Sequence, residues 1–236
     1  MNQTTFRVEI PDEIASEQMI IARDRLKRYV RGCQNSIRLA VELNRRNVTP
    51  EIMGIPGPAA KNRIMLQHLI SNPKARYLQV GAGYGATFCS ALAGNEPEYA
   101  CVVDNFVGDQ KKAFNENTKK FIKSKFDVFN RSDIFSLTKT QQSKLAEQKI
   151  NTYMYTGPAT EEDHFKAVTE YYDCLDDVFI IIVNDWNNLD ARKGTFRGLQ
   201  EKNVNVQWQI DLKATGSKDT REWWNGVWVA VCIKRK

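Results

Sequence analysis

The chain has 236 residues, which suits one domain with an appendage, and its 42% apolar content is enough for a sizeable buried core. No apolar run approaches the ~18 residues of a membrane-spanning helix and the first residues do not resemble a signal peptide, so we expect a cytoplasmic protein. The net charge of +6 comes from scattered basic residues without interleaved aromatic side chains, which makes a nucleic-acid partner unlikely. The five cysteines form no CxxC pair, which predicts buried free thiols rather than a zinc site.

Residues 12–46 are expected to form one long helix. Its apolar side chains recur at spacings of four, three, four and three residues, namely Leu26, Val30, Cys33, Ile37 and Ala40. This stripe predicts either packing on the main domain or a homo-oligomer formed through the helix. Residues 49–58 follow with three prolines and two glycines, so they are predicted to be a structured turn that closes an N-terminal helical extension over residues 1–58.

The main domain is predicted over residues 59–236, where strands alternate with helices. The expected strands are 76–80, 99–105, 126–133, 150–157, 178–186, 204–212 and 227–234, and the expected helices include 59–71, 110–123, 160–175 and 190–201. Alternation of this kind implies a parallel sheet, and the last two strands, which lack a helix between them, should pair antiparallel. The predicted fold class is therefore α/β, a Rossmann-like seven-stranded, mostly parallel sheet with an antiparallel last strand.

A glycine-rich loop follows the first predicted strand and a carboxylate, Asp104, ends the second. Glycines let the backbone pass close to a ligand, and an acid at this place can accept hydrogen bonds from a ribose. The predicted cofactor-binding residues here are Gln79, Gly81, Ala82, Gly83, Tyr84, Gly85, Thr87, Asp104, Asn105 and Phe106. The glycine spacing fits either NAD or S-adenosylmethionine (SAM). SAM is favoured because no residues remain for the separate substrate domain that NAD-dependent oxidoreductases more often have.

Three later stretches carry a resemblance to a known family. YMYTGPATEEDHFKAVTEYYDCLDDVFIIIVNDWNN, GTFRGLQ and WWNGVWVAV resemble small SAM-dependent methyltransferases that are frequent in phages and large DNA viruses and are related to sugar O-methyltransferases. The resemblance covers roughly residues 54–233 and implies methyl transfer from SAM to a hydroxyl of a sugar or glycan, including a rhamnose-type deoxysugar. It would place the protein in the host cytoplasm if the source is viral. It also implies cofactor contacts by Ser132, Asp133 and Ile134 beside the adenine, and by Thr156 and Gly157.

The chain departs from that family at three positions. Thr156, Ala159 and Asn184 stand where the family has Asp, His and Asp, and only Asp185 of the acidic pair remains. One carboxylate with amide and hydroxyl oxygens is a poor magnesium site. We therefore expect no metal, with a divalent cation as the less favoured alternative.

Candidate catalytic residues follow the most apolar strand and open the preceding helix. Asp185 is the predicted base, Asn184 is expected to orient the acceptor, and His164 is the alternative base, although a solvent-facing structural role is a close competitor. The candidate acceptor contacts are Trp186, Arg63 and Arg192. Three other functions stay open: a nucleic-acid methyltransferase, an NAD-dependent oxidoreductase and a catalytically silent SAM-binding protein.

Overall fold

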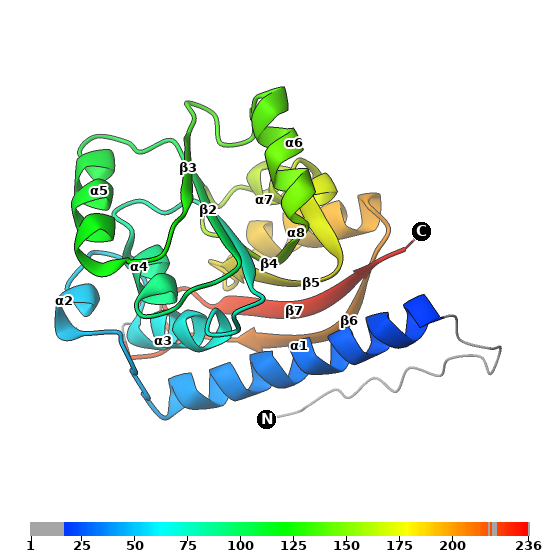
Figure 1. Cartoon of the computed structure of the whole chain (residues 1–236), viewed down its shortest axis with the longest axis horizontal. Helices are drawn as coiled ribbons and strands as arrows, with labels where there is room; N and C mark the ends of the chain where they lie inside the picture. Colours follow the sequence, from blue (N-terminus) through cyan, green and yellow to red (C-terminus); the bar gives the residue numbers. More distant parts are fainter. Residues whose placement is uncertain (1–16, 217, 219–220, 236) are drawn as a thin grey trace.

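The protein folds around one seven-stranded sheet, as Figure 1 shows. The computed structural model describes residues 17–235 except 217, 219 and 220, with side chains described from residue 22 onward. The strands are β1 (Arg76–Val80), β2 (Tyr99–Asp104), β3 (Asp127–Asn130), β4 (Ile150–Tyr155), β5 (Leu175–Asn184), β6 (Val204–Leu212) and β7 (Val227–Lys234), in the spatial order β3-β2-β1-β4-β5-β7-β6. All neighbouring pairs from β3 to β5 are parallel, whereas β7 runs antiparallel to both β5 and β6. The predicted fold class is confirmed.

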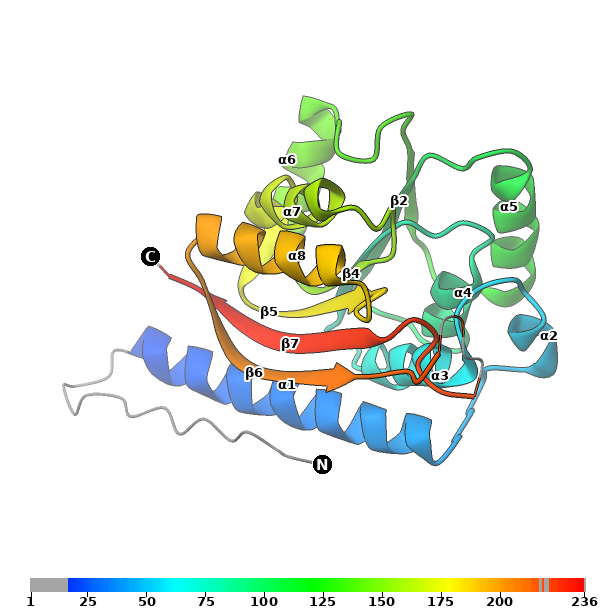
Figure 2. The ribbon, with the colours of Figure 1, turned by 180° about the vertical axis from the view of Figure 1, so that it is seen from behind.

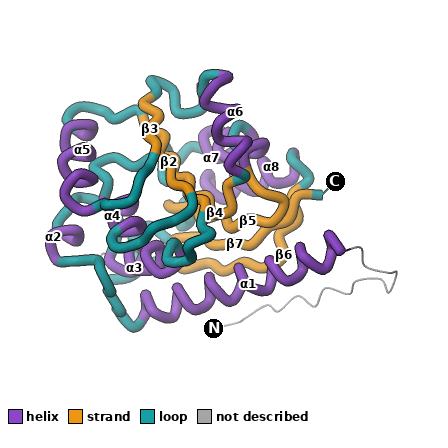
Figure 3. Tube along the Cα trace, in the orientation of Figure 1, coloured by secondary structure: helices purple, strands orange, loops and turns teal. Residues whose placement is uncertain are grey.

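Helices cover both faces of the sheet, which makes a three-layer α/β/α architecture. The helices are α1 (Glu17–Val41), α2 (Pro50–Met53), α3 (Ala60–Leu69), α4 (Ala86–Leu92), α5 (Gln110–Phe121), α6 (Lys139–Gln148), α7 (Glu161–Thr169) and α8 (Leu189–Glu201). Figure 2 shows α1 and α3 on one face and α6, α7 and α8 on the other. Figure 3 separates the strands from the helices by colour.

Side chains alternate between two buried cores, one on each face of the sheet. Val227, Val229 and Val231 of β7 join the core under α1 and α3, while Trp228 and Ala230 of the same strand join the core under α6, α7 and α8. Because successive side chains of a strand point to opposite faces, a strand covered on both sides must be apolar throughout. This explains why the sequences of β5 and β7 are nearly continuous apolar runs.

The long N-terminal helix packs on the chain's own sheet. Cys33 and Ala40 of its apolar stripe are buried in the first core, and Leu26, Val30 and Ile37 pack against that core. The packing alternative of the sequence prediction is thus confirmed for the described part of the helix; residues 12–16 lie outside it, and a homo-oligomer remains a prediction. Neither α1 nor any other described helix is apolar over a length that could cross a membrane.

Two short helices escaped the sequence prediction, and two helices were predicted several residues too long, one of them being α1, which ends at Val41 instead of residue 46. α6 is the first of the two short helices; Thr138 caps it in a capping box with Gln141. The second is α2, which lies inside the predicted turn and is capped by Thr49. The helix expected over 160–175 ends at Thr169, and β5 begins at Leu175 instead of residue 178.

Candidate active site

The loop between β1 and α4 forms one wall of the candidate site. Gly81, Gly83 and Gly85 all have positive φ angles, of 83°, 52° and 88°, which side chains rarely allow. A Cβ atom on Gly81 would lie 2.6 Å from the backbone nitrogen of Gly157, at the end of β4. The glycine at this position therefore lets the loop touch the neighbouring strand end.

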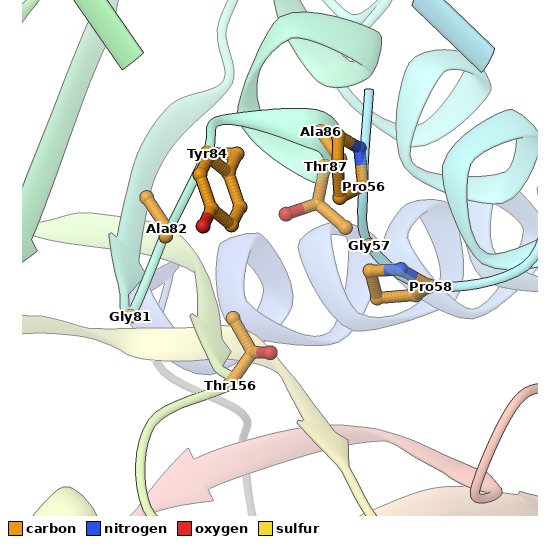
Figure 4. A pocket seen from close by; sticks show the side chains of 10 residues that line it. Pro56, Gly57, Pro58, Gly81, Ala82, Tyr84, Ala86, Thr87 and Thr156 are labelled. Carbon is orange, nitrogen blue, oxygen red and sulfur yellow. The ribbon is translucent and has the colours of Figure 1, made fainter. Parts of the chain in front are cut away.

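An open pocket of about 290 Å³ lies beside this loop, at the carboxyl ends of the parallel strands. Figure 4 shows the glycine loop on one side, a short segment of residues 56–58 on the other, and Thr156 between them. We call residues 56–58 the strap. The pocket is lined by Pro56, Gly57, Pro58, Gly81, Ala82, Gly83, Tyr84, Ala86, Thr87 and Thr156. Five of the cofactor-binding residues predicted around the glycine loop, together with Thr156, thus share one cavity with residues 56–58, which had been assigned only to a turn.

Asp104 ties the glycine loop to the end of β2. Its carboxylate is 3% exposed and accepts hydrogen bonds from the backbone N–H groups of Ala82, Gly83 (2.8 Å) and Phe106 (2.6 Å). A carboxylate has about four acceptor positions, so one direction remains beyond these three bonds. Asp104 has a definite role in holding the loop; a contact with a ribose remains a prediction.

Gln79 and Thr87 brace the loop from behind. The Gln79 amide is fully buried and donates to the Gly81 carbonyl (2.8 Å) and the Thr87 hydroxyl (2.7 Å), while it accepts from the Tyr77 hydroxyl (2.8 Å). Gln79 therefore positions the pocket wall without facing the pocket. Past Asp104, Asn105 is exposed, whereas Phe106 is buried with a positive φ of 44°.

The loop after β3 lies against the end of β4. The Asp133 carboxylate accepts from the Ser136 hydroxyl (2.6 Å) and the Phe135 N–H (3.0 Å), and the first of these bonds is the main reason that the pKa of Asp133 is lowered. Ile134 is buried, and its Cδ1 would be 3.0 Å from a Cβ on Gly157. Ile134, a predicted adenine contact, and Gly157, a predicted cofactor contact, are thus neighbours. Asp133 forms a local turn, and Ser132 is exposed beside it.

Polar side chains meet where β4 and β5 end. Asn184 donates from Nδ2 to the Thr156 hydroxyl (3.1 Å), while its Oδ1 is buried and has no partner among the described residues. Asp185 is half-buried with a positive φ of 58°, and its Oδ1 accepts from Nδ2 of Asn225 (2.6 Å). Backbone strain in a non-glycine residue at a strand end is typical of functional sites. Asn225 lies in the turn before β7 and was not among the predicted site residues.

The donor set at this place does not suit a metal. Nowhere in the described part of the chain do three His, Cys, Asp or Glu side chains gather as ligands. Asn184 donates an N–H to the Thr156 hydroxyl, and Asp185 is the one carboxylate of this group, which is a poor ligand set for a hard divalent cation.

His164 was predicted as an alternative base or a solvent-facing residue; the solvent-facing interpretation is wrong, and the role as a base stays a prediction. The side chain is 1% exposed and lies edge-on against the Tyr155 ring, with Nδ1 3.4 Å from the Thr195 hydroxyl. Burial lowers its pKa to about 4, because the charged imidazolium loses its hydration. Gly194 of α8 allows this burial, since a Cβ there would lie 2.8 Å from the His164 Cβ.

Trp186 is too deeply buried to form an open wall for an acceptor, whereas the acceptor contact of the half-buried Arg192 stays a prediction. The Trp186 side chain is 1% exposed, stacks on Trp228 at 4.9 Å between ring centroids, and donates from Nε1 to Asp211 (3.0 Å). Arg192 donates from Nε to the Trp186 carbonyl. These residues pack α8 against the sheet.

Arg63 holds the strap in place. The guanidinium is 3% exposed and donates to the carbonyls of Pro58 (2.7 Å), Ile52 (2.8 Å), Met53 (3.2 Å) and Ile55 (2.8 Å). The sequence signal for these bonds is a proline- and glycine-rich run close to an arginine. That pattern does not reveal which backbone carbonyls the arginine binds.

Comparisons with known proteins point to one fold. No protein-family model matches the chain, and no curated protein matches it. Among solved structures, it is similar to a predicted RNA methyltransferase from Pyrococcus horikoshii, with a TM-score of 0.54 and 15% identity over 85% of this chain and 96% of that one. It is also similar to the O-methyltransferase from Bacillus cereus in complex with SAH (TM-score 0.50, 11% identity, 85% of this chain and 91% of that one). A third is the O-methyltransferase TomG from Streptomyces achromogenes in complex with SAM (TM-score 0.50, 10% identity, 85% and 90%). With the sheet order above, these similarities show that the chain has the fold of the class I SAM-dependent methyltransferases.

Proposed function

We propose that this protein is a SAM-dependent O-methyltransferase that methylates a hydroxyl of a sugar or glycan. The observation that carries the proposal is the pocket between the glycine loop and the strap, at the carboxyl ends of β1 and β4. Similar folds bind SAM or SAH in the Bacillus cereus and TomG structures. The sugar acceptor rests on the sequence resemblance alone.

The residues of the pocket fit a cofactor of this kind. Gly57 and Gly81 let the segments around the pocket approach closely, since a Cβ on Gly57 would lie 2.6 Å from the Ala86 Cβ and one on Gly81 would lie 2.6 Å from the Gly157 nitrogen. The unpartnered Oδ1 of Asn184 offers a buried acceptor at the adjoining strand end. We propose that Asp104 accepts from a ribose hydroxyl in its remaining direction, and that Ile134 and Gly157 border the adenine.

When bound, SAM supplies a methyl group on a positively charged sulfur that is already a good leaving centre. The protein must then align the acceptor oxygen with that methyl group and remove the hydroxyl proton. Alignment can contribute roughly 7–11 kcal/mol to lowering the barrier. A base placed within hydrogen-bond reach of the hydroxyl adds typically ~10²–10⁴-fold.

Asp185 is the proposed base. Its Oδ1 is held by Asn225, which fixes the orientation of the carboxylate and leaves Oδ2 to take the proton. The buried Asn184 Oδ1 belongs to the residue just before Asp185 in the chain. We propose that it accepts a hydrogen bond from the molecule that receives the methyl group and so orients that molecule. With His164 buried away from the pocket, Asp185 carries this role alone in the proposal.

The test is a methyl-transfer assay with labelled SAM against deoxysugar glycosides, catechols and RNA or DNA oligonucleotides. Transfer to a glycoside supports the proposal. Methyl transfer to nucleic acid and to no glycoside would contradict the sugar acceptor and identify the protein as a nucleic-acid methyltransferase. Stoichiometric SAM binding without turnover on any acceptor would indicate a silent SAM-binding protein.

A further inference from the structure

A second pocket, of about 340 Å³, lies against the strap next to the first one. It is lined by residues 53–60, by Arg63 and by Trp224, and the strap residues 56–58 border both cavities. We call this cavity the strap pocket. Its position brings a ligand bound there next to the place proposed for the cofactor.

The strap pocket contains a buried positive charge that no carboxylate neutralises among the described residues. Four of the N–H groups of Arg63 donate to backbone carbonyls, which are neutral, and one N–H of Nη2 remains without an acceptor among the described residues. That nitrogen lies at the strap, 3.5 Å from where a Gly57 Cβ would be. A buried cation without a counter-ion is costly, and an anionic group placed beside it offsets that cost.

One further feature of the cavity wall favours an anion. Ala59 begins α3 without a side-chain cap, and no acidic residue lies in the first turn, so its N–H groups keep their partial positive charge. Lys61 in that turn is already paired with Glu222 at 3.0 Å. Burial lowers the pKa of Arg63 to about 10, which shows how strongly its surroundings disfavour an isolated charge, yet the group stays charged at neutral pH.

The remaining wall is apolar. Met53, Ile55 and the strap prolines form one side, and the half-buried Trp224 comes from the turn before β7 with a positive φ of 61°. An aromatic face of this kind packs against a ring or the C–H face of a sugar. The wall therefore fits the body of an organic molecule, and Arg63 fits its charged end.

We propose that the strap pocket binds the acceptor and that the acceptor carries an oxyanion, a carboxylate or phosphate, on a sugar or ring body. This inference rests on the proposed methyltransferase function and narrows its substrate class. Arg63 holds the oxyanion, Trp224 packs on the body, and the acceptor hydroxyl extends past the strap toward Asp185.

The test compares two ligands that differ in charge, 4-nitrophenyl glucuronide and the neutral 4-nitrophenyl glucoside, by calorimetric titration, with 4-nitrophenyl phosphate as a second anion. The glucuronide should bind at least ~10-fold tighter than the glucoside, the factor expected for a charge-assisted hydrogen bond. In Arg63→Gln the ratio of the two dissociation constants, glucoside to glucuronide, should fall to near one. Trp224→Ala should weaken the binding of both ligands and keep that ratio. Arg38→Gln, at an exposed arginine of α1, is the matched control and should change neither the affinities nor their ratio. If Arg63→Gln does not fold, the inference is still tested by the affinity ratio of the wild type and by the weaker binding expected in Trp224→Ala.

Each titration is repeated with saturating SAH. Undiminished glucuronide binding supports an acceptor pocket, whereas competition by SAH would assign the strap pocket to the cofactor's own carboxylate and overturn the inference. Equal affinity for glucuronide and glucoside would also overturn it. If SAH binds while the charge preference is absent, only this inference fails; if SAH does not bind at all, the proposed function fails with it.

Discussion

Asn225 donates a hydrogen bond from Nδ2 to Oδ1 of Asp185 across 2.6 Å, and this bond joins the end of the central strand β5 to the turn before β7. The two residues are 40 positions apart in the sequence. The bond fixes one carboxylate oxygen of Asp185 and so defines the direction of the other. This relationship makes the proposed base testable.

Replacing Asp185 by Asn should lower the methyl-transfer rate by at least ~10²-fold, because the shape is kept while the basicity is lost. The dissociation constant for SAH should stay unchanged, since the proposed role concerns the acceptor proton. Asp190→Asn, an exposed substitution at the start of α8, serves as the control and should retain the wild-type rate. Near-normal transfer by Asp185→Asn would remove Asp185 as the base.

Asp104→Ala should weaken SAH binding by on the order of ten- to a hundredfold, because each charge-assisted hydrogen bond contributes about 1.5–3 kcal/mol net. Loss of loop anchoring and loss of a ribose contact can be separated with 5′-methylthioadenosine and its 2′,3′-dideoxy form. A ribose contact predicts that the wild type prefers the hydroxylated ligand and that Asp104→Ala does not. If the preference survives in the variant, Asp104 only holds the loop.

Gly81→Ala should abolish cofactor binding and destabilise the protein. The added Cβ would lie 2.6 Å from backbone atoms of Thr156 and Gly157, in addition to the strain of the positive φ. Gly108→Ala is the matched control, since its φ is also positive at 64° but its Cβ would meet nothing within 4 Å. Gly108→Ala should lower the unfolding free energy by only about 1–2 kcal/mol. If a denaturant titration shows the same loss of unfolding free energy in both variants, the close approach of the loop and the strand is contradicted.

The fold should lose stability in acid through His164. Its folded-state pKa of about 4 lies below the ordinary value of 6.5, so the folded protein disfavours the protonated form. The stabilisation by neutral His164 is therefore fully present above pH 6.5 and disappears as the pH falls toward 4. It amounts to about 2–4 kcal/mol. Urea titrations should show a smaller loss over this range in His164→Gln than in wild type, with His68→Gln as the control; parallel curves for all three proteins would contradict the assignment.

Methyl transfer should survive excess EDTA largely intact. The Thr156 hydroxyl is engaged by Asn184 Nδ2, and Asp185, the one carboxylate of the group, is a weak site for a divalent cation. Activity that disappears on chelation and returns with Mg²⁺ or Mn²⁺ would show that Asp185 recruits other ligands.

Local patterns in the sequence predicted the sheet well. The strands β1 and β7 have the bounds that their apolar runs and flanking turns indicate, and the missing helix between β6 and β7 predicted their antiparallel pairing. α6 was not predicted because it buries one residue, Leu145, and so lacks an apolar period; its Thr138 cap was the available signal.

The site was predictable only where it is local. The glycine loop and the carboxylates at strand ends are visible in short stretches, whereas the partners of Asp185 and the carbonyls around Arg63 depend on distant segments. His164 illustrates the limit most clearly. Its burial depends on Gly194 of α8, which has no side chain to keep α7 away. The pattern of α7 alone carries no information on that packing.

The most direct test of this account is a calorimetric titration of the purified protein with SAM, SAH and NAD. The pocket between the glycine loop and the strap predicts stoichiometric, micromolar binding of SAM and SAH and none of NAD. Binding of NAD without binding of SAM or SAH would contradict the account and make the protein an NAD-dependent oxidoreductase on the same fold.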